Sequence, residues 1–481
     1  MKIRSGLILA IMFAGLQVFA AGQDPAPQDA PAQTSGDNSD RSAPAAALSA
    51  IAGMQSEGGA EDTSSDLPQI PAMLGGKGNS TAFLTEMERS NYLRAGVNVG
   101  ANYDDNPLLR SPAESNTSET VFGNIRIEES TSRMRWNLGY AGGLTVNQKI
   151  TNQNQGSHNL NFDSQFRLSP HVNLRIAETF SMTTGFFDAG NGGEIVAGSG
   201  GPNASLLAPL ATQRSSVTTV ETNYHYALND LVGASGSFYD LHFTNVPTPA
   251  AGTQAIQLTD TQTASGSAFW LHRIFRNDWA GVSYRFDRIT FNPNGETRVH
   301  SFTAVNTLSF SRRFTVSGFI GPQYSENQGV VSGSAEPTQS NDWSVGGGVE
   351  GGWQSEHTSL SVGYSRTISD GGGVLGSVRL QSVHGTFRRE LVPGWAAALT
   401  ASHGTNQSIT VPFATSASSI NLTSAGISLE RNVSKSVGLR LGYAHDFQQQ
   451  MGVTDPTATP DAHRNRFFVT LSYQWAKPLG M

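Results

Sequence analysis

The sequence predicts an all-β protein: a transmembrane antiparallel β-barrel of about 18 strands (16–18) that follows a disordered N-terminal linker. Three observations predict it. Long segments in which apolar and polar residues alternate recur from Leu93 to Trp475. The breaks between the segments alternate between short and long. The segments are also longer than the strands of soluble sandwiches and have the length needed to cross a bilayer at a tilt.

Composition excludes several other classes. The chain has 481 residues, no cysteine, 14% charged residues and a formal net charge of −7. A disulfide scaffold and a cysteine-ligated metal centre are therefore excluded, and the charge balance disfavours a nucleic-acid binder. Helical membrane proteins need about 20 consecutive apolar residues per span, and no such run follows the N-terminus. We predict no cofactor and no metal.

Residues 1–20 have the pattern of a secretory signal peptide. A short basic start precedes an apolar run from Gly6 to Phe19, and Val18 and Ala20 suit the −3 and −1 sites of a cleavage point. The alternative is an uncleaved signal anchor. The run is short for a membrane span, and polar sequence follows it directly, so we expect cleavage and export.

Residues 21–92 form the predicted linker, which is rich in Pro, Ala, Ser and acidic residues. Between Ala21 and Ser90 there are ten acidic and three basic residues, and no hydrophobic period is visible. Such a composition predicts disorder. Residues 80–92 could form one short helix with Phe83, Leu84 and Met87 on one face, or a loose turn before the barrel.

The predicted barrel occupies residues 93–475, and residues 476–481 are a C-terminal tail. The breaks after even-numbered segments are tight, whereas most of those after odd-numbered segments are long, as in outer-membrane barrels. A soluble β-solenoid or propeller would need a repeat of fixed length, and none is found. The predicted strands are 93–103, 119–128, 133–148, 158–168, 171–184, 216–227, 231–243, 259–272, 279–291, 298–310, 314–324, 342–353, 359–368, 377–388, 395–405, 419–430, 435–447 and 464–475.

Six of the seven tryptophans lie near the ends of segments that meet at the rim with the short breaks. Trp343 alone belongs to the other rim. Aromatic girdles at membrane interfaces explain this sorting, which random core tryptophans would not show. The predicted girdle residues are Trp136, Trp270, Trp279, Trp353, Trp395 and Trp475.

Eighteen strands enclose an aqueous lumen unless something fills it, and the linker is too polar to be a plug domain. The longest loop, residues 185–215, carries Asp188 and Glu194 and is predicted to fold inward as a constriction; the alternative is an external lid. The predicted pore-lining arginines are Arg94, Arg126, Arg135, Arg167 and Arg175. Facing the loop carboxylates, they would set a transverse field that orients polar solutes. Alternatively, they pair with Glu128 or Asp163 and only keep the wall hydrated. From residue 91 on, 26 basic and 28 acidic residues nearly balance, so strong selectivity is not predicted.

The last segment resembles the final strand of bacterial outer-membrane β-barrel proteins. Phe467, Val469, Leu471, Tyr473 and Trp475 alternate with polar residues and end on an aromatic. This resemblance implies that the barrel-assembly machinery recognises the strand. The chain departs from the porin pattern because Ala476 to Met481 extend beyond the aromatic. Asn-Tyr-Asp-Asp-Asn at 102–106 is similar to a motif of uncharacterised barrels associated with exopolysaccharide or exosortase systems.

These features predict a protein of the bacterial outer membrane, in contact with its lipid and with the linker in the periplasm. The predicted function is a porin-like, water-filled pore for passive diffusion of small polar solutes. The alternative is a structural or export-partner barrel of a surface polysaccharide system. Histidines and serines show no catalytic or metal-ligand spacing, so no enzyme is predicted. A homo-oligomer is left open.

Overall fold

The computed structural model describes residues 91–479 with several gaps. The gaps are 108–112, 151–153, 185–211, 245–258, 276, 293–294, 312, 331–336, 372–375, 410–418, 435 and 452–460. The predicted signal peptide, nearly all of the linker and the loop that carries Asp188 and Glu194 lie outside the described residues. Within the described ranges, the structure contains no helix with the length and apolarity to span a membrane.

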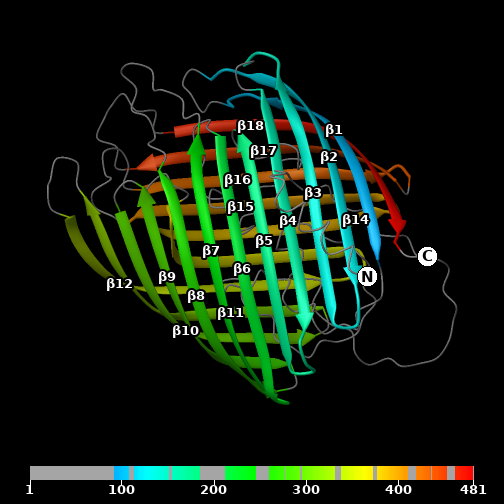
Figure 1. Cartoon of the computed structure of the whole chain (residues 1–481). Helices are drawn as coiled ribbons and strands as arrows, with labels where there is room; N and C mark the ends of the chain where they lie inside the picture. Colours follow the sequence, from blue (N-terminus) through cyan, green and yellow to red (C-terminus); the bar gives the residue numbers. More distant parts are fainter. Residues whose placement is uncertain are drawn as a thin grey trace, which may run out of the picture.

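The described residues form a single closed sheet of eighteen antiparallel strands (Figure 1). Each strand pairs with its neighbours in sequence, and β1 pairs with β18 from Tyr92↔Pro478 to Asp104↔Arg466. Closure leaves no strand edge unpaired, as a sheet in lipid requires. The strands are β1 (Tyr92–Asp104), β2 (Asn116–Ser130), β3 (Met134–Asn147), β4 (Gln155–Arg167), β5 (Val172–Thr184), β6 (Thr212–Ala227), β7 (Asp230–Thr244), β8 (Asp260–Phe275), β9 (Asp278–Asn292), β10 (Gly295–Ser311), β11 (Phe314–Val330), β12 (Pro337–Gln354), β13 (Thr358–Ser369), β14 (Val378–Val392), β15 (Trp395–Ser408), β16 (Ser419–Asn432), β17 (Val437–Met451) and β18 (Asp461–Pro478).

All eighteen predicted strands are confirmed, and most of them are longer than expected. β11 runs to Val330 and β12 starts at Pro337. Beyond the membrane a strand needs no apolar outer face, so the alternation that predicts the strand ends before the strand does. The two predicted ends of the barrel domain also differ from the structure. Tyr92 belongs to β1 and not to a preceding helix, and β18 continues through Ala476 to Pro478, where it pairs with the first residues of β1. The tail that departs from the porin pattern therefore extends the seam of the barrel.

Every connection after an even-numbered strand has two to four residues, so these turns form one rim, here called the short-turn rim. Hydroxyl side chains fix several of the turns. Val172 N–H donates to Ser169 Oγ at 3.1 Å, and Val437 N–H donates to Ser434 Oγ at the same distance. Gly394 takes φ +80° in a two-residue turn, a conformation that suits glycine. The opposite end, where the connections are mostly longer, is the long-loop rim.

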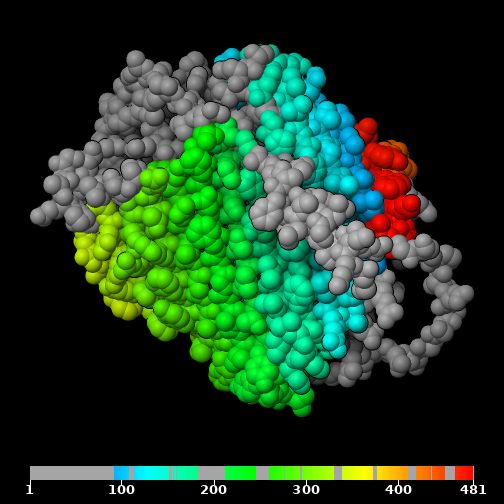
Figure 2. All heavy atoms as spheres, in the orientation of Figure 1, coloured from blue at the N-terminus to red at the C-terminus, as the bar shows by residue number. Residues whose placement is uncertain are grey.

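The outer face carries the apolar residues of the alternation. Leu144 and Ile320 are each 63% exposed, and Val99, Val362 and Val469 on other strands are also exposed. Figure 2 shows the outer face over the green strands as a broad convex surface. A broad apolar surface open to the surroundings is expected only where lipid covers it. The residues between these positions point into the barrel and form the lumen wall.

Candidate functional site

The lumen wall is polar and charged on the strands at either side of the β1–β18 seam. Its buried polar residues include Asn98, Thr120, Glu221, Asn406 and Gln448. Buried polar groups must find hydrogen-bond partners, and many do so across neighbouring strands. Asn116 Nδ2 donates to Asn147 Oδ1 at 2.8 Å, and Ser424 Oγ donates to Asp446 Oδ1 at the same distance. This part of the wall suits a water-filled interior.

The five arginines predicted to line the pore all occupy lumen-facing positions by strand register. Arg94 on β1 lies directly opposite Arg126 on β2. Arg126 Nη2 is 2.6 Å from Glu128 Oε1, and its Nε donates to Asn137. Arg175 Nε also donates to Asp163 Oδ2 at 2.9 Å. Two of the five arginines, Arg126 and Arg175, therefore pair with wall carboxylates, as the alternative prediction stated.

Further arginines face the lumen near the short-turn rim, and sequence reasoning missed them. Arg388 Nη2 lies 3.1 Å from Glu430 Oε2, and Arg440 Nε lies 3.5 Å from Oε1 of the same carboxylate. Arg388 reaches over β15 to do so, because Ala398 between the two strands is small. The alternation of residues along β14 and β17 shows which side chains face the lumen and could have revealed these arginines. On β14, however, both faces carry arginine, so the pattern there is ambiguous.

Charges on the described lumen wall in the half near the short-turn rim do not balance. On the strands, eight arginines face six carboxylates, which leaves an excess of two positive charges. We call this set the basic vestibule. Its arginines are Arg94, Arg126, Arg135, Arg167, Arg175, Arg273, Arg388 and Arg440, and its carboxylates are Glu128, Asp163, Glu221, Glu350, Glu390 and Glu430.

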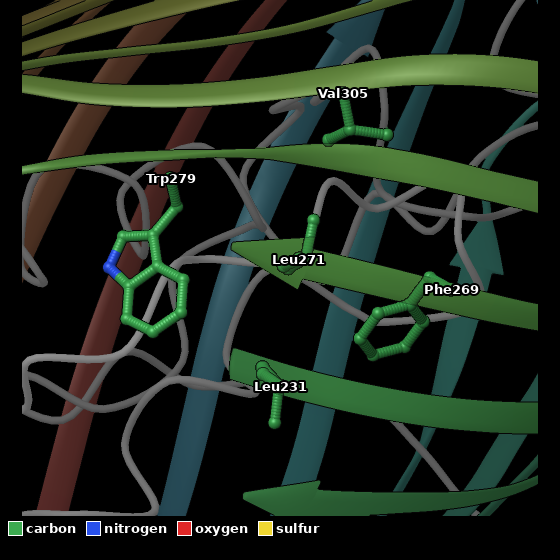
Figure 3. Close-up of a cluster of buried hydrophobic side chains, with 5 residues drawn as sticks. All are labelled: Leu231, Phe269, Leu271, Trp279 and Val305. Carbon is green, nitrogen blue, oxygen red and sulfur yellow. The ribbon is translucent and has the colours of Figure 1, made fainter. Parts of the chain in front are cut away.

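The inner wall formed by β7–β11 is different, and the expectation of a polar inner face is wrong there. Leu231, Phe269, Leu271, Trp279 and Val305 form a cluster inside the barrel (Figure 3). Each is at most 5% exposed, and Phe319 packs against them. A second cluster of Tyr239, Leu241 and Phe243 lies nearer the long-loop rim. The lumen thus has an apolar wall as well as a charged one.

Trp279 does not belong to the outer girdle, which corrects the prediction. It lies opposite Arg273 on β8 and Thr307 on β10, and the Arg273 guanidinium carbon is 5.7 Å from its ring centroid. The other five predicted tryptophans face outward near the short-turn rim. Trp270 Nε1 donates to the Tyr226 hydroxyl at 3.0 Å, and Trp136 Nε1 donates to Glu129 at 3.1 Å. A tryptophan ring with a hydrogen-bonded N–H group suits a membrane interface.

An aromatic layer on the outer face near the long-loop rim was not predicted beyond Trp343. Its members other than Trp343 are Phe, Tyr and His, so counting tryptophans could not find it. Ring centroids of Tyr324 and Trp343 are 4.9 Å apart, and those of Tyr284 and Phe302 are 4.7 Å apart. On the far side of the barrel, Phe447 stacks on His463 at 4.5 Å. The apolar band thus lies between two aromatic layers.

The two described ends of the connection between β13 and β14 fold into the barrel at the long-loop rim. Thr261 Oγ1 on the inner wall of β8 donates to Asp370 Oδ2 at 3.0 Å. Ser377 Oγ donates at 2.6 Å to Thr297 Oγ1 on β10, which in turn donates to Asn327 on β11. Asp370 and Ser377 are buried, and Gly371 and Gly376 have positive φ, which permits the tight bend. Asp370, Gly371, Gly376 and Ser377 are here called the strap.

The strap folds inward, as the loop 185–215 was expected to do. Asp188 and Glu194 lie outside the described residues, so the predicted field between them and the arginines stays a prediction. No group of three or more His, Asp or Glu side chains arranged to hold a metal occurs in the described part of the chain.

A closed antiparallel barrel with an apolar outer band between aromatic layers defines a transmembrane β-barrel of the outer-membrane type. No protein-family model matches the sequence, and no curated protein matches it. Among solved structures, Pseudomonas aeruginosa OccK1 (OpdK) is similar, with 9% identity over 80% of this chain and 99% of that chain and a TM-score of 0.39. Acinetobacter baumannii OccAB2 has 10% identity over 82% of this chain and 99% of that chain, with a TM-score of 0.42. Pseudomonas aeruginosa OprD has 11% identity over 82% of this chain and 97% of that chain, with a TM-score of 0.40.

Proposed function

We propose that this protein is a porin-like barrel of the bacterial outer membrane that lets small polar solutes diffuse passively through its lumen. Eighteen strands enclose an interior too wide for wall side chains alone to fill. The polar wall beside the seam provides a hydrated path, while the apolar clusters on β7–β11 and the strap narrow it. No catalytic step is part of the proposal.

The observation that carries the proposal is the basic vestibule. Charged residues in a membrane protein are costly, and they face water-filled cavities or one another. The vestibule has more arginine than carboxylate, so pairing within the wall does not neutralise it. A net positive mouth attracts small anions and repels small cations. Sequence counting missed this preference, because it could not separate lumen-facing charges from those on the outside.

Conductance of the purified full-length chain in a planar bilayer tests the proposal. We expect stable conductance steps without any added partner, and a reversal potential in a salt gradient that indicates anion preference. A barrel that stays closed until a partner is added would contradict the pore and support the export-partner alternative. Arg389→Gln, an outward-facing change on β14, is the matched control and should leave both readouts unchanged.

We also propose that the barrel-assembly machinery recognises β18. Phe467, Val469, Leu471, Tyr473 and Trp475 all face outward and are exposed. In the closed barrel both edges of β18 are paired, one with β17 and one with β1. The edge is thus free for another protein only before closure. Replacing Tyr473 and Trp475 together with Ala should slow folding in cells more than in detergent, as followed by heat-modifiable gel mobility.

A further inference from the structure

Most of the described arginines on the outer face near the long-loop rim have a partner. Arg288 Nη2 lies 2.7 Å from Glu296 Oε2, and Arg298 Nε lies 2.6 Å from Oε1 of the same carboxylate. The guanidinium carbon of Arg214 lies 5.2 Å from the ring centroid of Phe180. A charged side chain on the lipid side of a barrel is costly, so such pairing is expected.

Arg366 on β13 is the exception. Strand register places it on the outer face, opposite Gly347 on β12 and Gln381 on β14. Its side chain is partly buried, and its Nε has no hydrogen-bond partner. It makes no ion pair with any carboxylate of the described ranges, whereas Arg379 on the next strand pairs with Asp342. A buried N–H donor that stays without an acceptor is unfavourable, so this position favours an anionic ligand.

The outer face around Arg366 lacks carboxylates. On β13–β17, the described outward positions in the half nearest the long-loop rim carry no Asp or Glu. Amide and imidazole side chains there include Gln381, His403, Gln407 and Asn421. On β7–β11, the corresponding outward positions carry Asp240, Asp260, Glu296 and Glu326. The charge of Arg366 is therefore not offset on its own side of the barrel.

The surface directly below Arg366 is apolar. Val349, Tyr364 and Val383 lie in register on β12, β13 and β14, one outward row closer to the short-turn rim. Their exposed fractions are 51%, 40% and 47%. A ligand with an anionic head and apolar chains would use both the arginine and this row. A free anion would leave the row uncovered, so the surface fits a lipid better than an ion.

The aromatic layer near the long-loop rim places Arg366 close to lipid headgroups. Trp343, a member of that layer, lies two outward positions above Gly347 on β12. An arginine just below an interfacial aromatic layer can extend its long side chain to the headgroup region. Short turns face the periplasm in outer-membrane barrels, so the long-loop rim belongs to the outer leaflet. A guanidinium group binds a phosphate with two parallel hydrogen bonds.

We propose that Arg366 binds the phosphate group of an anionic lipid in the outer leaflet of the membrane. Gln381 is the second polar contact to the headgroup. Val349, Tyr364 and Val383 pack against the acyl chains. The lipid phosphate supplies the acceptor that the described part of the chain does not give to Arg366. The site lies outside the barrel, so its occupancy does not depend on transport through the lumen.

Native mass spectrometry of the purified full-length protein tests the inference. The probes are lipid A, a phosphorylated glycolipid, the same lipid with its phosphates removed, and inorganic phosphate. We expect the protein to retain the phosphorylated lipid and not the dephosphorylated one. Equal retention of the two lipids would overturn the proposal on the unmodified protein. Release of the lipid by inorganic phosphate at the same concentration would show that the apolar row contributes nothing, and would overturn a lipid as the ligand.

Two variants locate the site. Arg366→Gln should weaken retention of the phosphorylated lipid about tenfold, since a charge-assisted hydrogen bond to phosphate is lost. Arg366→Lys keeps the charge and should restore part of the affinity. Arg288→Gln is the matched control, because this outward-facing arginine at the same rim already pairs with Glu296. It should leave retention unchanged.

Two outcomes with these variants would refute the site. Equal loss of lipid in Arg366→Gln and Arg288→Gln would show that binding depends on general surface charge. Unchanged lipid retention in Arg366→Gln, together with loss of a cross-linked dimer, would identify a second copy of the chain as the partner of this face. Heat-modifiable gel mobility confirms that each variant has folded before the lipid is added.

Discussion

At the scale of single residues, the Asn-Tyr-Asp-Asp-Asn motif closes the barrel near the long-loop rim. Asp104 Oδ2 accepts from Arg464 Nε at 2.7 Å, and Asp105 accepts from the backbone and side-chain amides of Asn465. These partners are separated by 360 residues in sequence. Next to them, Arg466 Nη2 lies 2.9 Å from Asp446, and both side chains are almost fully buried. The motif is thus a structural clasp between the first and last strands.

Asp104→Asn tests this clasp. The substitution leaves the buried Arg464 guanidinium without its carboxylate, and breaking a buried pair in this way costs about 3–5 kcal/mol. We expect unfolding at lower urea concentration, followed by tryptophan fluorescence and by loss of heat-modifiable gel mobility. Asp461→Asn, at an exposed position at the start of β18, is the control. Equal urea midpoints for the two variants would show that the clasp contributes nothing to stability.

At the scale of elements, the strap connects β13–β14 to the inner wall of β8, β10 and β11. Its contacts are one hydroxyl–carboxylate and one hydroxyl–hydroxyl hydrogen bond, which contribute about 1 kcal/mol each. Thr261→Val together with Ser377→Ala removes the donors to Asp370 and Thr297, and we expect a larger open-pore conductance. Thr263→Val changes the next lumen-facing residue of β8 and should have no such effect. Unchanged conductance in the double variant would mean that the strap does not narrow the path.

Another element-scale feature is a carboxylate on the outer face of β5. Glu178 lies between Ile176 and Phe180 on the apolar side, and Ser216 and Thr218 on β6 donate to it. An acidic group in the lipid band is destabilising, although less so than Arg or Lys. Glu178→Leu should therefore stabilise the barrel by about 1–2 kcal/mol in urea if lipid covers this face. Destabilisation together with loss of a cross-linked dimer would instead identify the face as a contact between copies.

At the scale of the whole molecule, selectivity depends on the summed field of the lumen and not on any one pair. Arg126→Gln and Arg135→Gln together remove the two excess positive charges of the vestibule. We expect the reversal potential in a salt gradient to move toward cation preference, with a smaller shift at high salt because of screening. Measurement at two ionic strengths distinguishes this effect from a change in pore width. An unaltered reversal potential at low salt would contradict a selective role for the vestibule.

Strand number and position could be predicted because the alternation of residues along a strand is local. The pattern at Val437, Leu439 and Leu441 shows which side chains face outward, since apolar side chains lie on one face only. β9 carries apolar residues on both faces. Ala280, Val282 and Phe286 face out, while Trp279, Ile289 and Phe291 face in. Hydrophobicity alone could not choose the phase there, so the assignment of Trp279 failed and the inner apolar clusters were missed.

The sequence by itself determined an all-β membrane barrel with eighteen strands, two unlike rims and a polar linker of net charge −7. Periodicity, turn residues and charge are properties of short segments, and they persist whatever the rest of the chain does. Only the tertiary structure decided that Asp104 meets Arg464, that Trp279 lies inside, and that the strap reaches Thr261 across the four strands β9–β12. These contacts depend on closure and register, because closing the sheet brings together residues that no local pattern relates.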